Sequence, residues 1–418
     1  MQRTTPLSFR PLFTSAVIVA SLGYFVDIYD LVLFSIIRVP SLEAIGLTGK
    51  ALLDTGLYLL NVQMIGMLIG GILWGVLGDK KGRLSVLFGS IILYSLANIA
   101  NGFVQTVEQY AILRFIAGIG LAGELGAGVT LVSELLPKEL RGYGTAMITA
   151  VGMAGALLAW TIAKVFGWQD CFFIGGGLGL VLLTLRFSVL ESGMFKKMMS
   201  MNVRRGRMID LFTDAKRFGK YLRCILIGLP TWFLIGILMT FAPEFAKAMG
   251  VHGAITGGEA IFWYYLGQLF GDITSGTMSQ MLGSRKRVLR LFLIGVGVIG
   301  ALYFLQGAST TTIFYGICTI LGITNGYWAL FVTVAAEQFG TNMRATVATT
   351  VPNFVRGALV PIALGFQTLK DLLGRQFSAD SALLYSGVIV GVIVLSIALI
   401  SVNGLDETFG KDLDYIET

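Results

Sequence analysis

Charged residues are scarce in this sequence. Only 13% of its 418 residues are charged and 55% are hydrophobic, whereas an ordinary soluble domain carries about a quarter charged residues. A soluble core cannot enclose so much apolar surface. The composition therefore excludes an ordinary soluble protein and favours a membrane protein.

Cysteine and histidine are scarce as well. Cys171, Cys224 and Cys318 lie far apart, in or beside apolar segments, and His252 is the single histidine. This pattern indicates neither a disulfide framework nor a metal site. Because no nucleophile with a neighbouring base is apparent either, an enzyme is the least favoured class and no cofactor is expected.

Long apolar runs recur along the whole chain. Each run is about twenty residues, long enough to cross about 30 Å of hydrocarbon as an α-helix, and a helix leaves no backbone group unpaired in lipid. We therefore predict an all-α membrane protein with twelve transmembrane helices. The predicted spans are residues 13–38, 51–77, 84–104, 108–136, 142–166, 170–190, 222–247, 258–282, 289–308, 311–337, 346–369 and 382–403.

Basic residues concentrate in alternate loops between these spans, above all from Lys196 to Arg223. By the positive-inside rule these loops are cytoplasmic, and so are both termini. The basic residues of the cytoplasmic loops account for most of the net charge of +7, so this charge does not indicate that the protein binds nucleic acid. The expected location is the cytoplasmic (inner) membrane of a bacterium. Arg38 and Lys164 fall near the outer membrane edge, where we expect their long side chains to reach water.

The spans fall into two sets of six. The polar, basic residues 191–221 separate residues 1–190 from residues 222–418. The loop "GVLGDKKGR" after the second span has a degraded copy, "GTMSQMLGSRK", after the eighth, and "ELLPKELR" ends the fourth span as "EQFGTNMR" ends the tenth. Both offsets are roughly two hundred residues, which indicates two duplicated, pseudo-symmetric six-helix bundles with a solute site between them.

These features resemble the major facilitator superfamily over essentially the whole chain. Within it, Arg114 followed by "GIGLAGELGAG", the "IYD" of the first span and the "LESGMF" after the sixth are similar to the metabolite:proton symporters and their sugar-porter and phosphate-porter relatives. The resemblance implies alternating access, in which two halves rock about a central site.

Gly118, Gly120 and Gly123 also spell the G-x-G-x-x-G pattern of a dinucleotide-binding turn. That turn needs a preceding strand and exposed amides at a helix N-terminus, whereas these glycines lie inside an apolar run. We interpret Gly118, Ala122 and Gly126, spaced four residues apart, as a smooth strip for close helix packing.

Several ionisable residues fall at membrane depth, where each charge costs about 2.5 to 3.5 kcal/mol. They are Asp27, Asp30, Arg114, Glu124, Asp272 and Arg356. Asp27 and Asp30 share a helix face and repel each other when both are ionised, so the pair favours holding a proton. An acid that alternately meets water and an arginine is able to carry a proton.

The resemblance assigns proton coupling to Asp30 and Arg114, the first acid of the phosphate-porter pattern to Asp27, and a place on the substrate path to Glu124. Asp27 and Glu124 are kept as further candidates for the proton carrier. Arg114 and Glu124 project toward similar sides of their helix, which makes both candidate substrate ligands. The alternative is that Asp30 and Arg114 form an inert ion pair between the first and fourth spans.

Arg356 lies between Pro352 and Pro361, which indicates a helix broken where a ligand binds. An arginine there can grip a carboxylate through two hydrogen bonds, or it can be a counter-ion for Asp272 or Glu124. Other polar and aromatic residues can either shape a pocket or only pack between helices. They are Gln63, Asn325, Trp328, Asn353, Trp263 and Gln268.

The repeated loop motifs predict a cytoplasmic gate, whose ion pairs favour one of two states because they form in only one of them. The gate residues are Gly75, Asp79, Gly82, Arg83, Glu134 and Arg141 in the first half and Arg285, Glu337 and Arg344 in the second. Gln280 and Ser284 replace the first copy's acid and arginine, so we expect the second gate to be weaker.

The sequence thus predicts a proton-coupled symporter of a small polar metabolite, an organic anion or a zwitterion, acting as a monomer. Its partners are the substrate, protons and the lipid bilayer. One alternative is a proton-driven exporter of drugs or siderophores, which needs a larger and less charged pocket. Another is a receptor that binds without transporting, which the lack of a sizeable soluble domain disfavours.

Overall fold

The computed structural model describes residues 10–81, 83–126, 128, 132, 136, 140–191 and 210–410. In these ranges each predicted span corresponds to one helix or to consecutive helices, and the β pairing is an isolated bridge between His252 and Thr310. Nine helical segments of this part of the chain are long and apolar enough to cross a membrane, and Val86–Asn101 is a shorter apolar helix. The protein is therefore a multi-pass, all-α membrane protein.

The helices of the first half are η1 (Arg10–Phe13), α1 (Ser15–Ala44), α2 (Gly49–Lys81), α3 (Arg83–Asn101), α4 (Val107–Leu121), α6 (Arg141–Val165) and α7 (Trp168–Glu191). Those of the second half are α9 (Asp210–Thr213), α10 (Ala215–Ile227), α11 (Leu229–Phe233), η3 (Leu234–Met239), α12 (Ala242–Met249), α13 (Gly257–Met281), α14 (Arg285–Leu305), α15 (Thr311–Asn325), α16 (Trp328–Glu337), α17 (Thr341–Gly357), α18 (Leu359–Leu373) and α19 (Ala379–Asn403).

A helix of the second half begins before the predicted span 222–247. α10 starts at Ala215, inside the predicted linker 191–221, because the Asp214 carboxylate accepts a hydrogen bond from the Arg217 N–H at 2.7 Å and caps the helix. Residues 192–209 of that linker lie outside the described residues. The predicted division of the chain at 190 and 222 stays a prediction.

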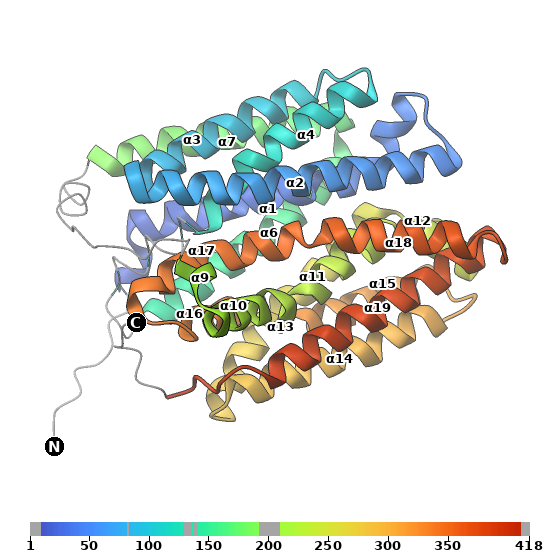
Figure 1. Cartoon of the computed structure of the whole chain (residues 1–418). Coiled ribbons are helices and arrows are strands. Elements are labelled where there is room, and N and C mark those ends of the chain that lie inside the picture. The colour runs from blue at the N-terminus through green and yellow to red at the C-terminus, as the bar shows by residue number, and fades with distance from the viewer. Residues whose placement is uncertain are drawn as a thin grey trace.

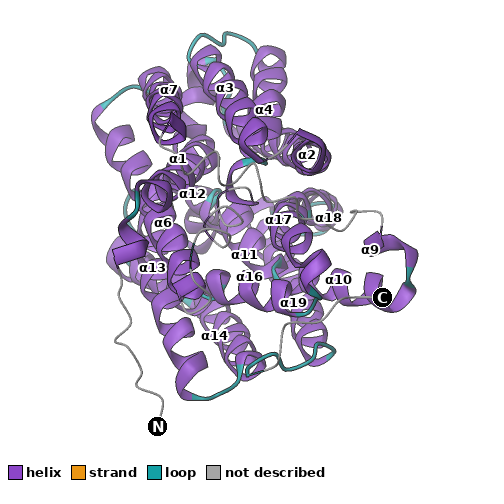
Figure 2. Ribbon diagram, turned by 90° about the vertical axis from the view of Figure 1, so that its left-hand side faces the viewer, coloured by secondary structure: helices purple, strands orange, loops and turns teal. Residues whose placement is uncertain are grey.

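The helices run roughly side by side along one axis and form two groups. Figure 1 shows α1, α2, α3, α4 and α7 in the upper group and α10, α13, α14 and α19 in the lower group. The view along the axis in Figure 2 shows that α6 with α13, and α2 with α17 and α18, meet between the two groups. The interface of the halves is therefore built mainly from α1, α2, α6, α13, α17 and α18.

The same helix pairings recur in both halves. α2 packs on α4, and α3 packs on α4 and α7, in the first half. In the second half α13 packs on α15, and α14 packs on α15 and α19. When the spans are numbered within each half, the same pairs are in contact: the second with the fourth, and the third with the fourth and the sixth. This is expected for two pseudo-symmetric bundles.

Glycines without room for a side chain lie at these repeated contacts. A Cβ at Gly118 of α4 would collide with the carbonyl oxygen of Gln63 in α2, and a Cβ at Gly322 of α15 would collide with that of Tyr264 in α13. Gly66 and Gly267 on the facing helices are equally crowded. The two sets lie roughly two hundred residues apart in the sequence, which is the repeat period that the loop motifs indicate.

The G-x-G-x-x-G glycines serve this packing. Gly118 faces the backbone of α2, and Gly120 and Gly123 face Tyr94 and Ser90 of α3. α4 ends at Leu121, with Ala122 as its C-cap. The part of the strip around Gly123 is therefore a turn, where the prediction was one continuous helix.

The described helices of the second half have several interruptions, and three of them lie at or next to Ile235, Trp328 and Arg356. A π-helical segment, η3, follows α11, and a two-residue break separates α15 from α16. The third break, at Ala358 between α17 and α18, confirms the prediction from the prolines around Arg356. Pro361 has no N–H to donate to the carbonyl of Gly357, so the α17 hydrogen-bond pattern cannot continue through this point.

Candidate functional site

An ion pair between Asp27 and Arg356 joins the two halves. The Arg356 Nη2 atom of α17 donates to Asp27 Oδ2 of α1 across 3.3 Å, and the two side chains are 1% and 0% exposed. Among the described residues, Asp27 Oδ1 and Arg356 Nε and Nη1 have no hydrogen-bond partner. Buried charges must stay paired to be tolerated. Asp27 therefore neutralises the charge of Arg356, while two of the hydrogen-bond donor atoms of Arg356 remain without a partner among the described residues.

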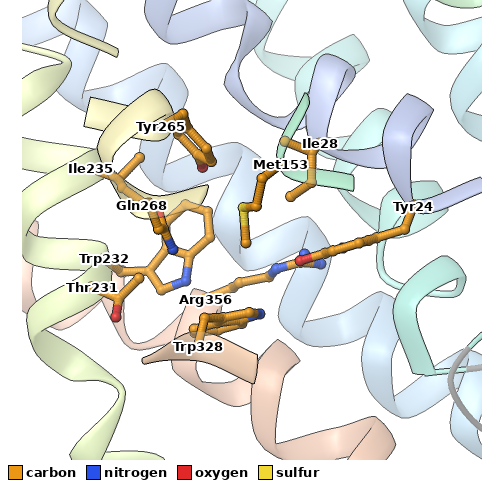
Figure 3. A pocket seen from close by; sticks show the side chains of 10 residues that line it. All are labelled: Tyr24, Ile28, Met153, Thr231, Trp232, Ile235, Tyr265, Gln268, Trp328 and Arg356. Carbon is orange, nitrogen blue, oxygen red and sulfur yellow. The ribbon is translucent and has the colours of Figure 1, made fainter. Parts of the chain in front are cut away.

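The Arg356 side chain also borders a small pocket between the halves (Figure 3). The pocket is lined by Tyr24, Ile28, Met153, Thr231, Trp232, Ile235, Tyr265, Gln268, Trp328 and Arg356. In the figure Arg356 extends toward Tyr24, while Trp232 and Gln268 lie on the opposite side. Two of the predicted pocket residues, Trp328 and Gln268, are among the lining residues. The pocket thus combines one cation with aromatic and aliphatic walls.

Asp272 and Asn325 hold the backbone around the break between α15 and α16. Asp272 Oδ1 accepts a hydrogen bond from the Ala329 N–H at 3.2 Å, in the first turn of α16. Asn325 donates to the Tyr264 hydroxyl at 2.7 Å and accepts from Thr231 at 3.2 Å. Neither residue lines the pocket. Their position indicates that they orient Trp328, the first residue of α16; their predicted contact with a substrate stays a prediction.

Asp30 and Arg114 lie in a second polar cluster, inside the first half. Arg114 donates to Asn98 Oδ1 at 2.6 Å, and its guanidinium lies 4.9 Å from the centre of the Phe172 ring. Both carboxylate oxygens of Asp30 lack a hydrogen-bond partner in the described part of the chain. Asp30 and Arg114 are close enough to interact electrostatically, but the simple ion pair of the alternative interpretation is not formed.

Glu124 lies away from the pocket and is paired within the first half. Its carboxylate accepts hydrogen bonds from Arg186 at 2.7 and 3.1 Å and from Ser90 at 3.0 Å. Arg186 was not identified from the sequence, although a basic residue inside the predicted span 170–190 was a visible signal. Arg356 is not the counter-ion of Glu124 or Asp272, as one interpretation had it, because Asp27 occupies that place.

Asn353 and Gln63 connect helices. Asn353 donates to the carbonyl of Ala122 at 2.9 Å and so joins α17 to the end of α4 across the interface. Gln63 makes a long, 3.5 Å hydrogen bond to the carbonyl of Leu31. Trp263 lies in α13 beside Phe262 and does not line the pocket.

The comparisons with known proteins agree with this architecture. The family model described as Major Facilitator Superfamily matches residues 13–359. The chain belongs to this superfamily. The niacin transporter NiaP of Acinetobacter baylyi is 27% identical over 365 residues, which are 78% of this chain and 80% of the relative.

Two further proteins of known name are similar to this superfamily member. The gentisate transporter of Corynebacterium glutamicum is 25% identical over 348 residues, covering 79% of this chain and 76% of the relative. The solved proton:xylose symporter XylE, bound to 6-bromo-6-deoxy-D-glucose, matches with a TM-score of 0.71 and 18% identity over 96% of this chain and 97% of that one. This structural likeness establishes the shared fold.

In this superfamily member, ion pairs join the two halves at the end where the C-terminus of α1 leads into α2. Arg38 donates to both oxygens of Glu244 at 2.6 and 2.8 Å, and its guanidinium lies 4.3 Å from the centre of the Phe241 ring. At the same end Lys370 pairs with Asp54 at 2.8 Å. We call the Arg38–Glu244 pair the latch. The prediction that Arg38 reaches water was wrong, because its side chain is 1% exposed.

Replacing Glu244 with Gln is expected to open the latched end. Removing one partner of a largely buried ion pair destabilises the closed arrangement by more than about 1.4 kcal/mol, or tenfold in population. A cysteine placed at Ser35, which hydrogen-bonds Thr240 beside the latch, should then react at least about tenfold faster with a membrane-impermeant maleimide. Glu43→Gln, an exposed glutamate in the last turn of α1, should leave the rate unchanged. Equal rates in Glu244→Gln and the unchanged protein would refute a latch.

The second-half gate residues Arg285 and Glu337 lie at the opposite end and contact each other. Arg285 donates to both carboxylate oxygens of Glu337 at 2.7 and 2.9 Å, and Thr408 donates to the same carboxylate at 2.7 Å. None of the described residues lies within 4 Å of the place that a Cβ on Gly75 of the first-half gate would take. Gly82 and Glu134 lie outside the described residues, as do the side chains of Asp79, Arg83, Arg141 and Arg344. The gate therefore stays a hypothesis.

The segment after α19 closes over this end of the second half. Burial raises the pKa of Glu407, but hydrogen bonds from Ser284 and from the N–H groups of Phe409, Arg285 and Lys286 outweigh it and lower the pKa below its usual value. A lowered folded-state pKa means that this contact stabilises the fold at neutral pH and is lost as the pH falls through that value. The carboxylate also lies where the dipole of α14 favours negative charge.

Proposed function

We propose that the protein is a proton-coupled symporter that carries a small aromatic monocarboxylate across a bacterial cytoplasmic membrane by alternating access. The observation that carries this proposal is Arg356, buried between the halves, bordering an aromatic pocket and paired with Asp27 of the other half. We further propose that it acts as a monomer with both termini in the cytoplasm.

The chemistry of the pocket supports an aromatic acid. The guanidinium of Arg356 can bind a carboxylate through two parallel hydrogen bonds, one from Nη2, which contacts Asp27 in this structure, and one from Nε or Nη1, which have no partner among the described residues. The faces of Tyr24, Trp328 and Tyr265 suit a flat ring, because offset and edge contacts between aromatic rings are favourable. The names of the niacin and gentisate relatives refer to compounds of this class. A small, charged pocket also fits a symporter better than an exporter of bulky apolar drugs.

Proton coupling follows from competition for one arginine. When the carboxylate of the substrate binds Arg356, Asp27 loses its partner while it stays buried. A buried carboxylate without a counter-ion is costly, so Asp27 takes up a proton. The site then holds one substrate and one proton with no unpaired charge, and the two halves can move about it.

The test is uptake by proteoliposomes under an imposed pH gradient, with nicotinate and nicotinamide as a pair of equal shape that differ in charge. We expect accumulation of nicotinate and of gentisate, loss of that accumulation when a protonophore collapses the gradient, and no accumulation of nicotinamide or xylose. The proposal would be contradicted if uptake of the acids were the same with and without the pH gradient, or if the neutral amide accumulated as much as the acids.

A further inference from the structure

The pocket has a second polar side, away from Arg356, that the proposed function does not use. Trp232 on α11 and Gln268 on α13 both line it and lie opposite Tyr24 (Figure 3). Trp232 is 4% exposed and Gln268 is 1% exposed. In the part of the chain that the structure describes, Trp232 Nε1 and Gln268 Oε1 have no hydrogen-bond partner. A donor and an acceptor are thus buried and unpaired in one cavity.

Such atoms need a partner, because a buried polar group without a hydrogen bond destabilises the protein. The neighbouring Thr231 hydroxyl donates to Asn325 instead. The other neighbours on this side include the apolar Ile235 and Met153. The missing hydrogen-bond partners of Trp232 and Gln268 must therefore come from the molecule that fills the pocket.

We propose that Trp232 and Gln268 form a second subsite that recognises a hydroxyl group on the substrate. A hydroxyl group accepts the hydrogen bond of the indole N–H and donates its own to the carboxamide oxygen, so it satisfies both atoms together. A ring nitrogen accepts one hydrogen bond and leaves the carboxamide oxygen unpaired. An unsubstituted ring leaves both unpaired.

The two subsites together define a class of ligand. Arg356 holds the carboxylate on the Tyr24 side, the ring lies between the aromatic and aliphatic walls, and the hydroxyl group reaches Trp232 and Gln268. This inference rests on the proposed function and adds to it the residues that select a hydroxylated aromatic acid over its unsubstituted parent.

The experiment measures dissociation constants of benzoate, 3-hydroxybenzoate and 4-hydroxybenzoate for the purified full chain and for Trp232→Phe and Gln268→Met. Each substitution removes the polar atom and keeps most of the side-chain volume. We expect at least one hydroxybenzoate to bind about tenfold or more tightly than benzoate, since a site with buried polar groups rejects the ligand that leaves them unpaired. Either substitution should reduce this preference to about twofold while benzoate binding changes little.

Trp263→Phe is the matched control, because this tryptophan is on α13 but outside the pocket, and it should keep the preference. Equal binding of benzoate and both hydroxybenzoates, or an equal loss for all acids in Trp232→Phe and Gln268→Met, would overturn the subsite and leave the proposed function intact. If no aromatic acid binds, both the proposed function and the subsite are wrong.

Discussion

Replacing Arg356 with alanine is expected to abolish aromatic-acid binding and transport. The substitution removes the donors for the carboxylate and leaves Asp27 buried without a partner. Truncating one member of a buried, hydrogen-bonded charge pair costs about 2–5 kcal/mol, so binding should weaken by roughly 30- to 4,000-fold. Arg356→Lys should recover only part of the loss, because lysine keeps the charge but not the paired donors. The dissociation constant of the acid, measured by calorimetry, checks both.

A double substitution separates lost binding from lost folding. Arg356→Gln combined with Asp27→Asn removes both charges, so no unpaired ion is left in the interface. We expect this variant to unfold at a temperature close to that of the unchanged protein and still fail to bind the acid. Normal acid binding by a well-folded double variant would show that Arg356 does not hold the carboxylate.

Replacing Asp27 with asparagine is expected to separate binding from proton coupling. Arg356 then has no competitor, so the acid should bind at least as tightly as before. Without the carboxyl group, however, the site takes up no proton with the substrate. A pH gradient should therefore no longer drive accumulation, and the ratio of internal to external acid should fall to about one, while exchange of labelled for unlabelled acid across the membrane continues.

Asp380→Asn is the control for this substitution, because Asp380 is an exposed acid in the first turn of α19, away from the pocket. That variant should accumulate the acid as the unchanged protein does. Continued gradient-driven accumulation by Asp27→Asn would move the proton role to Asp30, which lies nearby with both oxygens unpaired among the described residues.

The sequence predicted the parts of this architecture that depend on local pattern. Apolar runs long enough to cross the membrane fixed the helices, and the prolines on either side of Arg356 indicated the break after α17, because proline lacks a backbone donor wherever it stands. Gly118 was interpreted as a packing residue, and the structure shows it against the backbone of α2.

Partnerships between distant residues were harder to predict. Asp27 and Arg356 are separated by 329 positions, and no local pattern says which of several buried acids an arginine on another helix will meet. Glu124 was assigned to the substrate path by resemblance, but its partner Arg186 comes from α7 of the same half. Arg38 was expected to reach water, since the sequence does not show that Glu244 lies opposite it.

Two of the helix interruptions at the pocket could not be predicted from the local sequence either. The π-helical segment η3 and the turn before Trp328 contain no proline to mark them. Tertiary contacts stabilise at least one of them, since Asp272 accepts a hydrogen bond from the start of α16. Trp232 and Arg186 were not identified from the sequence, because their importance depends on which helices pack together.

The most direct test of the central claim is proton uptake during binding. Purified protein in a weakly buffered solution near neutral pH is mixed with a saturating aromatic acid, and a pH indicator counts the protons taken up. Competition for Arg356 predicts uptake of about one proton per acid bound by the unchanged protein and none by Asp27→Asn. Equal uptake by both proteins, or binding by the unchanged protein without any uptake, would contradict it.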